Sequence, residues 1–267
     1  MPLKQYTETL FRDTFLPSHD ASHHLRSWHI ARSVLKEIGK YNPTLTPSFI
    51  EAAMVAIFFH DLGMTETRDA RHGKKSKEIY LQWYNQLEEN RPALHDDILR
   101  AIEYHDRKAD EYFFEFPLKD PPDLLTLVNV SDDLDALGVI GIYRYAEIYL
   151  HRKVPLSSLG IRILENVALR YNNFSKATAF FPAIKAAHQP RYKEIVTFFD
   201  RYNQQILTES DPEDTFSGHV GVINYIRQLS VLGNTHPVDI PATLDNFRVG
   251  SFVREYFDAL AQKMQSS

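Results

Sequence analysis

Residues 47–60 constrain the fold most, because they predict a helix that is apolar on most of its sides. The apolar positions are Ala52, Met54, Val55, Ile57, Phe58 and Phe59. A helix of this kind has to be buried, so the chain must surround it with other helices. His60 and Asp61 stand where this helix ends. The segment therefore predicts a helical bundle with a His-Asp pair at the end of its most apolar helix.

Helical periodicity dominates from residue 3 to about residue 150, and strand-like alternation is scarce. The pattern predicts helices over residues 21–38, 75–89, 94–105 and 124–138. Residues 156–207 predict at least two more helices, with interruptions near 181–182 and 188–190. Polar, proline-bearing loops at 211–219 and 233–242 precede a last helix that ends near Met264. We therefore predict an all-α protein, with residues 1–155 as a helical bundle domain and residues 156–267 as a helical C-terminal extension that packs on it.

Composition narrows the class of protein. The chain has no cysteine, which removes thiolate ligands and disulfides. Its net charge of -5 weighs against a nucleic-acid binder, since a phosphate backbone is recruited by a basic face. The start lacks the apolar core of a signal peptide, and we find no apolar run long enough to span a bilayer. These observations predict a soluble, cytoplasmic protein with neither nucleic acid nor membrane as a partner.

Four polar residues share the inward faces of the predicted helices. His23 lies in register with Ile30 and Val34, and Asp132 follows Val128 by four residues, a spacing that places both on core faces. Likewise His105 shares a face with Ile98, and His72 with Ile79. A buried carboxylate without a partner is costly, and a cation is its natural compensation.

Taken one at a time, such residues are more often core histidines or capping aspartates. Taken together they indicate a metal site, because imidazoles and carboxylates are ligands of divalent cations. The ligand types do not select the ion: Mn, Fe, Mg, Co, Ni and Zn all bind such sites.

Five sequence segments occur in order, HDASHHLRSWHIA, AIFFHDLG, RHGKKS, AIEYHD and SDDLDALGVIGIYR. They resemble successive signatures of the HD-domain superfamily of metal-dependent phosphohydrolases, and of the small bacterial HD hydrolases in particular, over roughly residues 15–150. A lone His-Asp dipeptide would mean nothing, since the chain contains others at residues 19–20, 95–96 and 105–106. The order of the five segments carries the resemblance, which implies an HD-domain helical bundle.

The resemblance also implies roles for individual residues. One cation would be bound by His23, His60, Asp61 and Asp132. His72 and His105 correspond to positions that hold a second metal in binuclear members and face the substrate in mononuclear ones. His19 resembles the histidine that protonates the leaving group in the cyclic-nucleotide phosphodiesterases of the superfamily, although the His19-Asp20 pair fits a helix cap equally well. The catalytic candidates are therefore His105, His19 and Asp61.

The implied reaction is hydrolysis of a small phosphoester, a nucleotide by family-level expectation, through attack of metal-bound hydroxide. The substrate would then be a small, anionic, phosphate-containing molecule. Basic side chains beside the motifs could hold its phosphate together with His72, namely Arg26, Lys74 and Arg107. The long loop at 107–123 is a candidate lid. Two alternatives are a di-iron oxygenase of the same superfamily and a sensor that binds nucleotide or metal without turnover.

Several positions are left open. Ser27 stands where small bacterial members often have Val, and Val130 and Asp133 replace an acidic and a basic residue around Asp132, which puts the family's substrates in doubt. Asp135 could orient a metal ligand or could cap or pair locally. Residues 156–267 could complete the pocket, mediate a homodimer or cover apolar surface.

Overall fold

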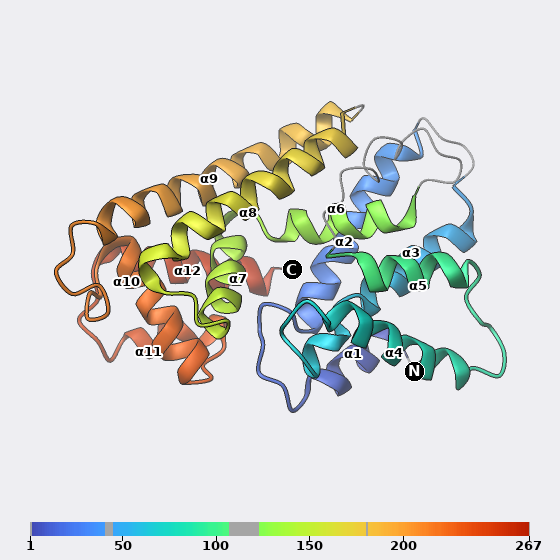
Figure 1. The fold of residues 1–267 in the computed structure, drawn as a ribbon, viewed down its shortest axis with the longest axis horizontal. Coiled ribbons are helices and arrows are strands. Elements are labelled where there is room, and N and C mark those ends of the chain that lie inside the picture. The colour runs from blue at the N-terminus through green and yellow to red at the C-terminus, as the bar shows by residue number, and fades with distance from the viewer. Residues whose placement is uncertain (1, 41–44, 107–122, 180, 267) are drawn as a thin grey trace. The chain divides into compact units, whose positions relative to one another are not determined.

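The computed structural model describes residues 2–266 except 41–44, 107–122 and 180. All regular elements in these ranges are helices, and no strand occurs among them, so the prediction of an all-α protein is confirmed. Figure 1 shows the helices in chain order. The candidate lid at 107–123 and Arg107 lie outside the described residues, apart from Asp123.

The first six long helices and one short 3-10 helix carry the predicted metal site. They are α1 (Leu3–Phe11), α2 (Ala21–Ile38), α3 (Pro47–Phe59), η1 (Leu62–Thr65), α4 (His72–Asn85), α5 (His95–Tyr104) and α6 (Leu124–Asp135). The rest of the chain forms α7 (Gly138–His151), α8 (Leu156–Ala177), α9 (Pro182–Ile206), α10 (Gly218–Tyr225), the π-helical η3 (Ile226–Leu232), η4 (Pro237–Asp239), α11 (Ile240–Leu244) and α12 (Ser251–Gln265).

The chain divides into two compact units. Unit 1 comprises Met1–Asp135 and Arg170–Ala187, and unit 2 comprises Ala136–Leu169 and His188–Ser267. These units differ from the expected division after residue 155, because α7 belongs with the later helices and the second half of α8 belongs with the earlier ones. The assignment of residues 1–155 and 156–267 to two functional domains stays a prediction.

In unit 1, α2, α3, α5 and α6 enclose the core. α2 packs on α3 and α6, α5 packs on α3 and α6, and α4 packs on α5 and η1. Local capping explains where three of these helices begin. Asp20 accepts a hydrogen bond from the backbone N–H of Ser22, Thr46 caps Phe49, and Asp123 caps Thr126. The interpretation of the His19-Asp20 pair as a helix cap is therefore confirmed for Asp20, which caps α2.

Helix α3 is buried as its composition predicts. Ala52, Ala56, Ile57 and Phe59 have no exposed surface. The expectation that no apolar run could span a bilayer is wrong on length and composition alone, since Pro47–Thr65 is long and apolar enough. However, 72% of this segment is buried inside the protein, which is the behaviour of a core helix.

Two predictions about the later helices need correction. α9 continues through Pro190, where an interruption was expected. Proline removes one backbone hydrogen bond, but Pro190 and Ala186 are both exposed, so water can satisfy the carbonyl that loses its partner. The expected loop at 233–242 is partly helical, because Pro237 and Pro241 occupy first-turn positions of η4 and α11, where proline is favourable.

Unit 2 has its own core. α7 packs on α12 and η3, and α10 packs on the same two elements. Tyr143 of α7 donates a hydrogen bond to the fully buried Glu147 and lies within hydrogen-bonding distance of Ser230 in η3. Helices α7, α9, α10 and α12 also line a groove of about 670 Å³ within this unit.

Candidate metal centre

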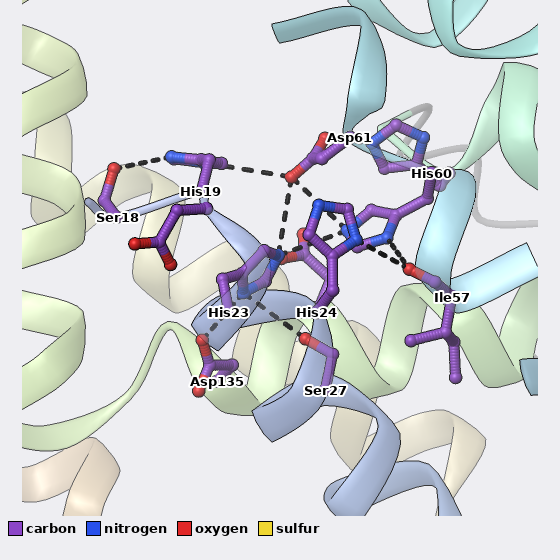
Figure 2. Close-up of polar contacts among 12 residues, drawn as sticks. Ser18, His19, His23, His24, Ser27, Ile57, His60, Asp61 and Asp135 are labelled. Atoms are coloured by element: carbon purple, nitrogen blue, oxygen red, sulfur yellow. Dashed lines mark hydrogen bonds and ion pairs between the residues drawn. The ribbon is translucent and has the colours of Figure 1, made fainter. Parts of the chain in front are cut away.

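Four residues from three helical regions converge inside unit 1. His23 comes from α2, His60 and Asp61 from the end of α3, and Asp132 from α6. His23 and His60 have no exposed surface, Asp61 is 3% exposed and Asp132 is 7% exposed. One ligand atom from each lies within 4.8 Å of the others, and Figure 2 shows His23 and His60 beside Asp61. This first group, as we call these four residues, could hold one metal ion.

A second group shares one residue with the first. It comprises Asp61, His72 from the start of α4 and His105 at the end of α5, all buried, with ligand atoms again within 4.8 Å. Asp61 Oδ2 lies 3.4 Å from His23 Nε2 and 3.3 Å from His60 Nε2. Its other oxygen, Oδ1, lies 3.4 Å from His72 Nε2 and 3.0 Å from His105 Nε2. The single carboxylate of Asp61 therefore faces both groups, one oxygen to each.

Backbone carbonyls set the orientation of three histidines. The Nδ1 atoms of His60, His72 and His105 lie 2.7, 2.7 and 2.8 Å from the carbonyl oxygens of Ile57, Asp69 and Ile102, each three residues earlier. A carbonyl oxygen only accepts hydrogen bonds, so each Nδ1 carries the hydrogen and donates it. In the neutral ring, Nε2 then has the lone pair that a metal requires.

The converging Nε2 atoms are the observation that fits a cation. His23 Nε2 lies 3.2 Å from His60 Nε2, and His72 Nε2 lies 3.1 Å from His105 Nε2. Two lone pairs aimed at each other repel, unless a proton or a cation lies between them. With the carboxylates of Asp61 and Asp132 beside them, these donor atoms are the set that divalent transition metals prefer.

Asp135 and Arg26 support His23. His23 Nδ1 donates to Asp135 Oδ2 at 2.8 Å, and Arg26 donates to both oxygens of Asp135 at 2.9 and 3.0 Å. The contact with His23 fits one expectation for Asp135, that it orients a ligand, and the contact with Arg26 fits the other, that it pairs with a neighbour. Arg26 is only 4% exposed, and its third nitrogen donates to Ser22. Its guanidinium thus has a structural task, and its predicted contact with substrate stays a prediction.

The pKa values of His60 and His105 are shifted in opposite directions. Burial lowers the pKa of His60, and the nearby charge of Asp61 offsets this only in part. Burial also acts to lower the pKa of His105, but the hydrogen bond to Asp61 and the charges of Asp61 and Asp106 outweigh it and raise the pKa to about 9. Burial acts to raise the pKa of Asp61, yet the His60 imidazole and hydrogen bonds from His105 and His23 hold it well below its usual range.

Two other predicted residues lie at different distances from the centre. His19 is 8% exposed, and its Nε2 lies 3.9 Å from Asp61 Oδ2, while its Nδ1 lies 2.5 Å from the Ser18 hydroxyl. Figure 2 shows it on the Asp61 side of the first group. Lys74 is exposed on α4, and its predicted contact with a phosphate stays a prediction.

Sequence reasoning missed Arg170, which lies in α8. Its Nη1 donates to Asp132 Oδ2 at 3.0 Å and to Asp133 Oδ1, and its Nη2 donates to Asp106 at 3.4 Å. An arginine on an ordinary amphipathic helix, 38 residues after Asp132, gives no local signal of such a contact.

Sequence reasoning also missed two glycines that allow the second group to form. A Cβ on Gly63 would lie 2.1 Å from the carbonyl oxygen of His72, and a Cβ on Gly73 would lie 2.5 Å from that of Glu103. Only glycine permits such close backbone approach. The first contact brings η1, next to Asp61, against α4, and the second brings α4 against α5 near His105.

The fold and the centre together define an all-helical protein with a buried His/Asp centre suited to divalent metal. Residues 20–137 match the family model described as HD domain. This part of the chain belongs to the HD-domain superfamily, a superfamily of metal-dependent phosphohydrolases. The matched range contains every residue of both groups, whereas His19 and Arg170 lie outside it. No curated protein and no solved structure matches the chain.

Proposed function

We propose that this protein is a metal-dependent phosphohydrolase that cleaves a small phosphoester, of which a nucleotide is the expected class. The observation that carries the proposal is the position of Asp61, whose two oxygens face two sets of imidazoles. A carboxylate placed between two sets of nitrogen donors suits a pair of divalent cations. Two cations suit hydrolysis of a phosphate ester, because they neutralise the charge on both sides of the displacement.

In this proposal His23, His60, Asp61 and Asp132 hold one cation, and Asp61, His72 and His105 hold the second. Bound divalent cations lower the pKa of a water molecule toward neutrality and polarise the phosphoryl oxygen. The chain itself keeps the ligands oriented, through the carbonyls of Ile57, Asp69 and Ile102 and the carboxylate of Asp135. Which metal is bound depends on geometry and supply as much as on the ligands.

Asp61 is better suited to hold cations and to orient a water molecule than to remove its proton. Its pKa is held well below the usual range, because burial is outweighed by the His60 imidazole and the hydrogen bonds from His105 and His23. A carboxylate with so low a pKa is a weak base.

A histidine protonates the leaving oxygen, and the number of bound cations decides which one. If His105 binds a second cation, its Nε2 has no proton to give, so the proton comes from His19. If only the first group is filled, His105 serves instead, because its Nε2 is free of metal and lies 3.0 Å from Asp61 Oδ1, to which it donates its proton.

In this proposal the two buried arginines near the centre contribute little to substrate binding, because carboxylates already hold them. Arg26 is held by Asp135, and Arg170 is held by Asp132 and Asp133. The metal ions and exposed residues such as Lys74 then attract the phosphate. We expect a small anionic substrate and no nucleic-acid partner, and a homodimer stays open.

The test combines metal analysis with turnover. The protein is purified without chelator, its metal content is measured by mass spectrometry, and phosphate release is assayed on a panel of nucleotides with Mn²⁺, Fe²⁺, Mg²⁺, Co²⁺, Ni²⁺ or Zn²⁺. Asp61→Asn is compared with Asp96→Asn, which changes an exposed aspartate in another His-Asp dipeptide.

We expect at least one metal ion per chain, and turnover that Asp61→Asn abolishes and Asp96→Asn retains. Bound metal without phosphate release from any substrate would overturn the hydrolase. In that case oxygen consumption by the iron form would indicate an oxygenase, and its absence a sensor. A chain that binds no metal even after supplementation would overturn the metal centre itself.

A further inference from the structure

Arg170 contacts Asp132, a residue of the first group. Its Nη1 lies 3.0 Å from Asp132 Oδ2. The other oxygen of Asp132, Oδ1, points the opposite way, 3.6 Å from His23 Nε2. Because the guanidinium holds one oxygen, the carboxylate cannot rotate freely, and Oδ1 stays directed at the first group.

The surroundings make this contact stronger than an ordinary surface ion pair. The Arg170 side chain is 14% exposed and that of Asp132 is 10% exposed, so solvent screens the pair only weakly. Nη1 also donates to Asp133, and Nη2 donates to Asp106, the neighbour of His105. Arg170 therefore sits among three carboxylates that would otherwise repel one another, and it offsets their charge without taking a place among the metal ligands.

The position of Arg170 in the chain also matters. It lies in α8, beyond the end of the HD match at residue 137, yet it belongs to the compact unit that holds both metal groups. A residue outside the matched segment thus contacts a residue inside the centre. Its hydrogen bond to Oδ2 leaves Oδ1 as the oxygen of Asp132 that faces the first group.

We propose that Arg170 is a positioning residue of the metal centre: it holds Asp132 Oδ2 so that Oδ1 is presented to the first cation. The inference rests on the proposed function in one respect, that the first group binds a cation. It predicts an effect on metal affinity, which a role limited to holding α8 in place would not have.

The test measures the affinity of the metal-free full chain for Mn²⁺ by titration calorimetry, alongside kcat, KM and the thermal midpoint without metal. The variants are Arg170→Gln and Arg170→Lys. Arg162→Gln is the matched control, since Arg162 is an exposed arginine on the same helix. We expect Arg170→Gln to weaken Mn²⁺ binding at the tighter site by roughly 10- to 100-fold, as for other partners of metal ligands.

Arg170→Lys should lie between Arg170→Gln and the wild type, because one ammonium group cannot hold Asp132 and Asp133 in the same fixed arrangement. Arg162→Gln should match the wild type. At saturating Mn²⁺ the kcat of Arg170→Gln should recover toward the wild-type value, since the defect lies in metal binding.

Wild-type Mn²⁺ affinity in Arg170→Gln, with or without a lower thermal midpoint, would overturn the inference. If that variant does not fold, Arg170→Lys decides, and wild-type affinity there would overturn it equally. A wild-type chain that binds no Mn²⁺ would instead contradict the proposed function, so the two failures are distinguishable.

Discussion

The two halves of the centre are supported in different ways. Side chains hold the first group: Asp135 orients His23, and Arg170 holds Asp132. The second group relies more on the backbone: Nδ1 of His72 and Nδ1 of His105 each donate to a carbonyl three residues earlier, and the only carboxylate in this group is the one shared with the first group. Four ligands, two of them held by side chains, form a better-defined site than three ligands of which one is shared. We infer that the first group binds its cation more tightly.

The two groups also differ in whether a histidine must lose a proton before a cation can bind. In the first group, burial lowers the pKa of His60, so a cation displaces no proton from it at neutral pH. In the second group, the hydrogen bond and charge of Asp61 outweigh burial and raise the pKa of His105 to about 9. A cation entering the second group therefore competes with a proton, and one entering at His60 does not.

The largest effect should come from His60→Gln, which removes a ligand from the tighter site. We expect metal affinity at the first group to fall by more than ~100-fold and turnover to be lost. Mutation of a residue that only supports a ligand already lowers metal affinity by roughly 10- to 100-fold, and loss of a ligand should cost more. Calorimetric titration with Mn²⁺ and a phosphate-release assay measure both. Retention of one tightly bound ion would show that the first group is not the principal site.

His72→Ala tests whether the second group binds its own cation. It removes a ligand from the second group and leaves the first group intact, so we expect the number of bound ions to fall from two to one while the tight ion remains. Metal content after dialysis, measured by mass spectrometry, gives the count. Loss of the tight ion would mean that the two groups do not bind separately.

Binding at the second group should depend on pH. Because the pKa of His105 is raised to about 9 by Asp61 against the effect of burial, the ring is protonated below pH 9 and a cation must displace that proton. Apparent affinity should therefore rise by at most about tenfold per pH unit and level off below pH 9, because a cation already in the first group weakens the hold of Asp61 on this proton. Mn²⁺ titrations between pH 6.5 and 9.5 measure this slope, and a flat profile would contradict it.

The same shift has a consequence for the metal-free protein. The pKa of folded His105 lies above the ordinary value of 6.5, because the hydrogen bond and charge of Asp61 outweigh burial. Its contribution to stability is thus fully present below pH 6.5 and is lost as pH rises through 9. In thermal melts with chelator, His105→Gln should remove this part of the pH dependence.

Asp135→Asn should weaken the first group by roughly 10- to 100-fold in metal affinity, because it removes the carboxylate that orients His23 and leaves Arg26 without its charge partner. Affinity at the second group should stay within a few-fold of the wild type. Titration calorimetry resolves the two sites, and equal losses at both would contradict the independent support of the two groups.

Ser27→Ala should have the smallest effect. The Ser27 hydroxyl lies 3.3 Å from His23 Nδ1, whose shorter contact, at 2.8 Å, is with Asp135. We expect metal affinity to change by about threefold at most, as for a weak hydrogen bond. A tenfold loss by the same titration would place Ser27 beside Asp135 as a support of His23.

Much of the centre could be predicted from sequence because its ligands sit on regular helices. The register of His23 with Ile30 and Val34 correctly predicts its burial, and α2 has the expected bounds. Asp132 is buried too, as its spacing from Val128 predicts, but this is a weaker test because almost every residue of α6 is buried. Periodicity reports which way a side chain faces, and that information is sufficient for residues whose partners lie in the core.

Contacts between distant segments could not be predicted in this way. Nothing near Arg170 in the sequence indicates Asp132 as its partner, and nothing near Gly73 indicates the carbonyl of Glu103. The path of α9 through Pro190 was missed because exposure to water, which satisfies the carbonyl of Ala186, is a property of the folded chain. Local patterns give the elements, but their partners depend on tertiary packing.

If both groups bind a cation, the shared carboxylate of Asp61 would couple the two. A cation at Oδ2 withdraws negative charge from Oδ1, the atom 3.0 Å from His105 Nε2, and so weakens the attraction that keeps a proton on that ring. Repulsion between the two cations acts in the opposite sense. By thermodynamic reciprocity, whatever factor the first ion applies to the affinity of the second, the second applies to the first. Metal occupancy at this centre would then be a property of the pair, and its signature would be a change in the affinity of one group when the other is already filled.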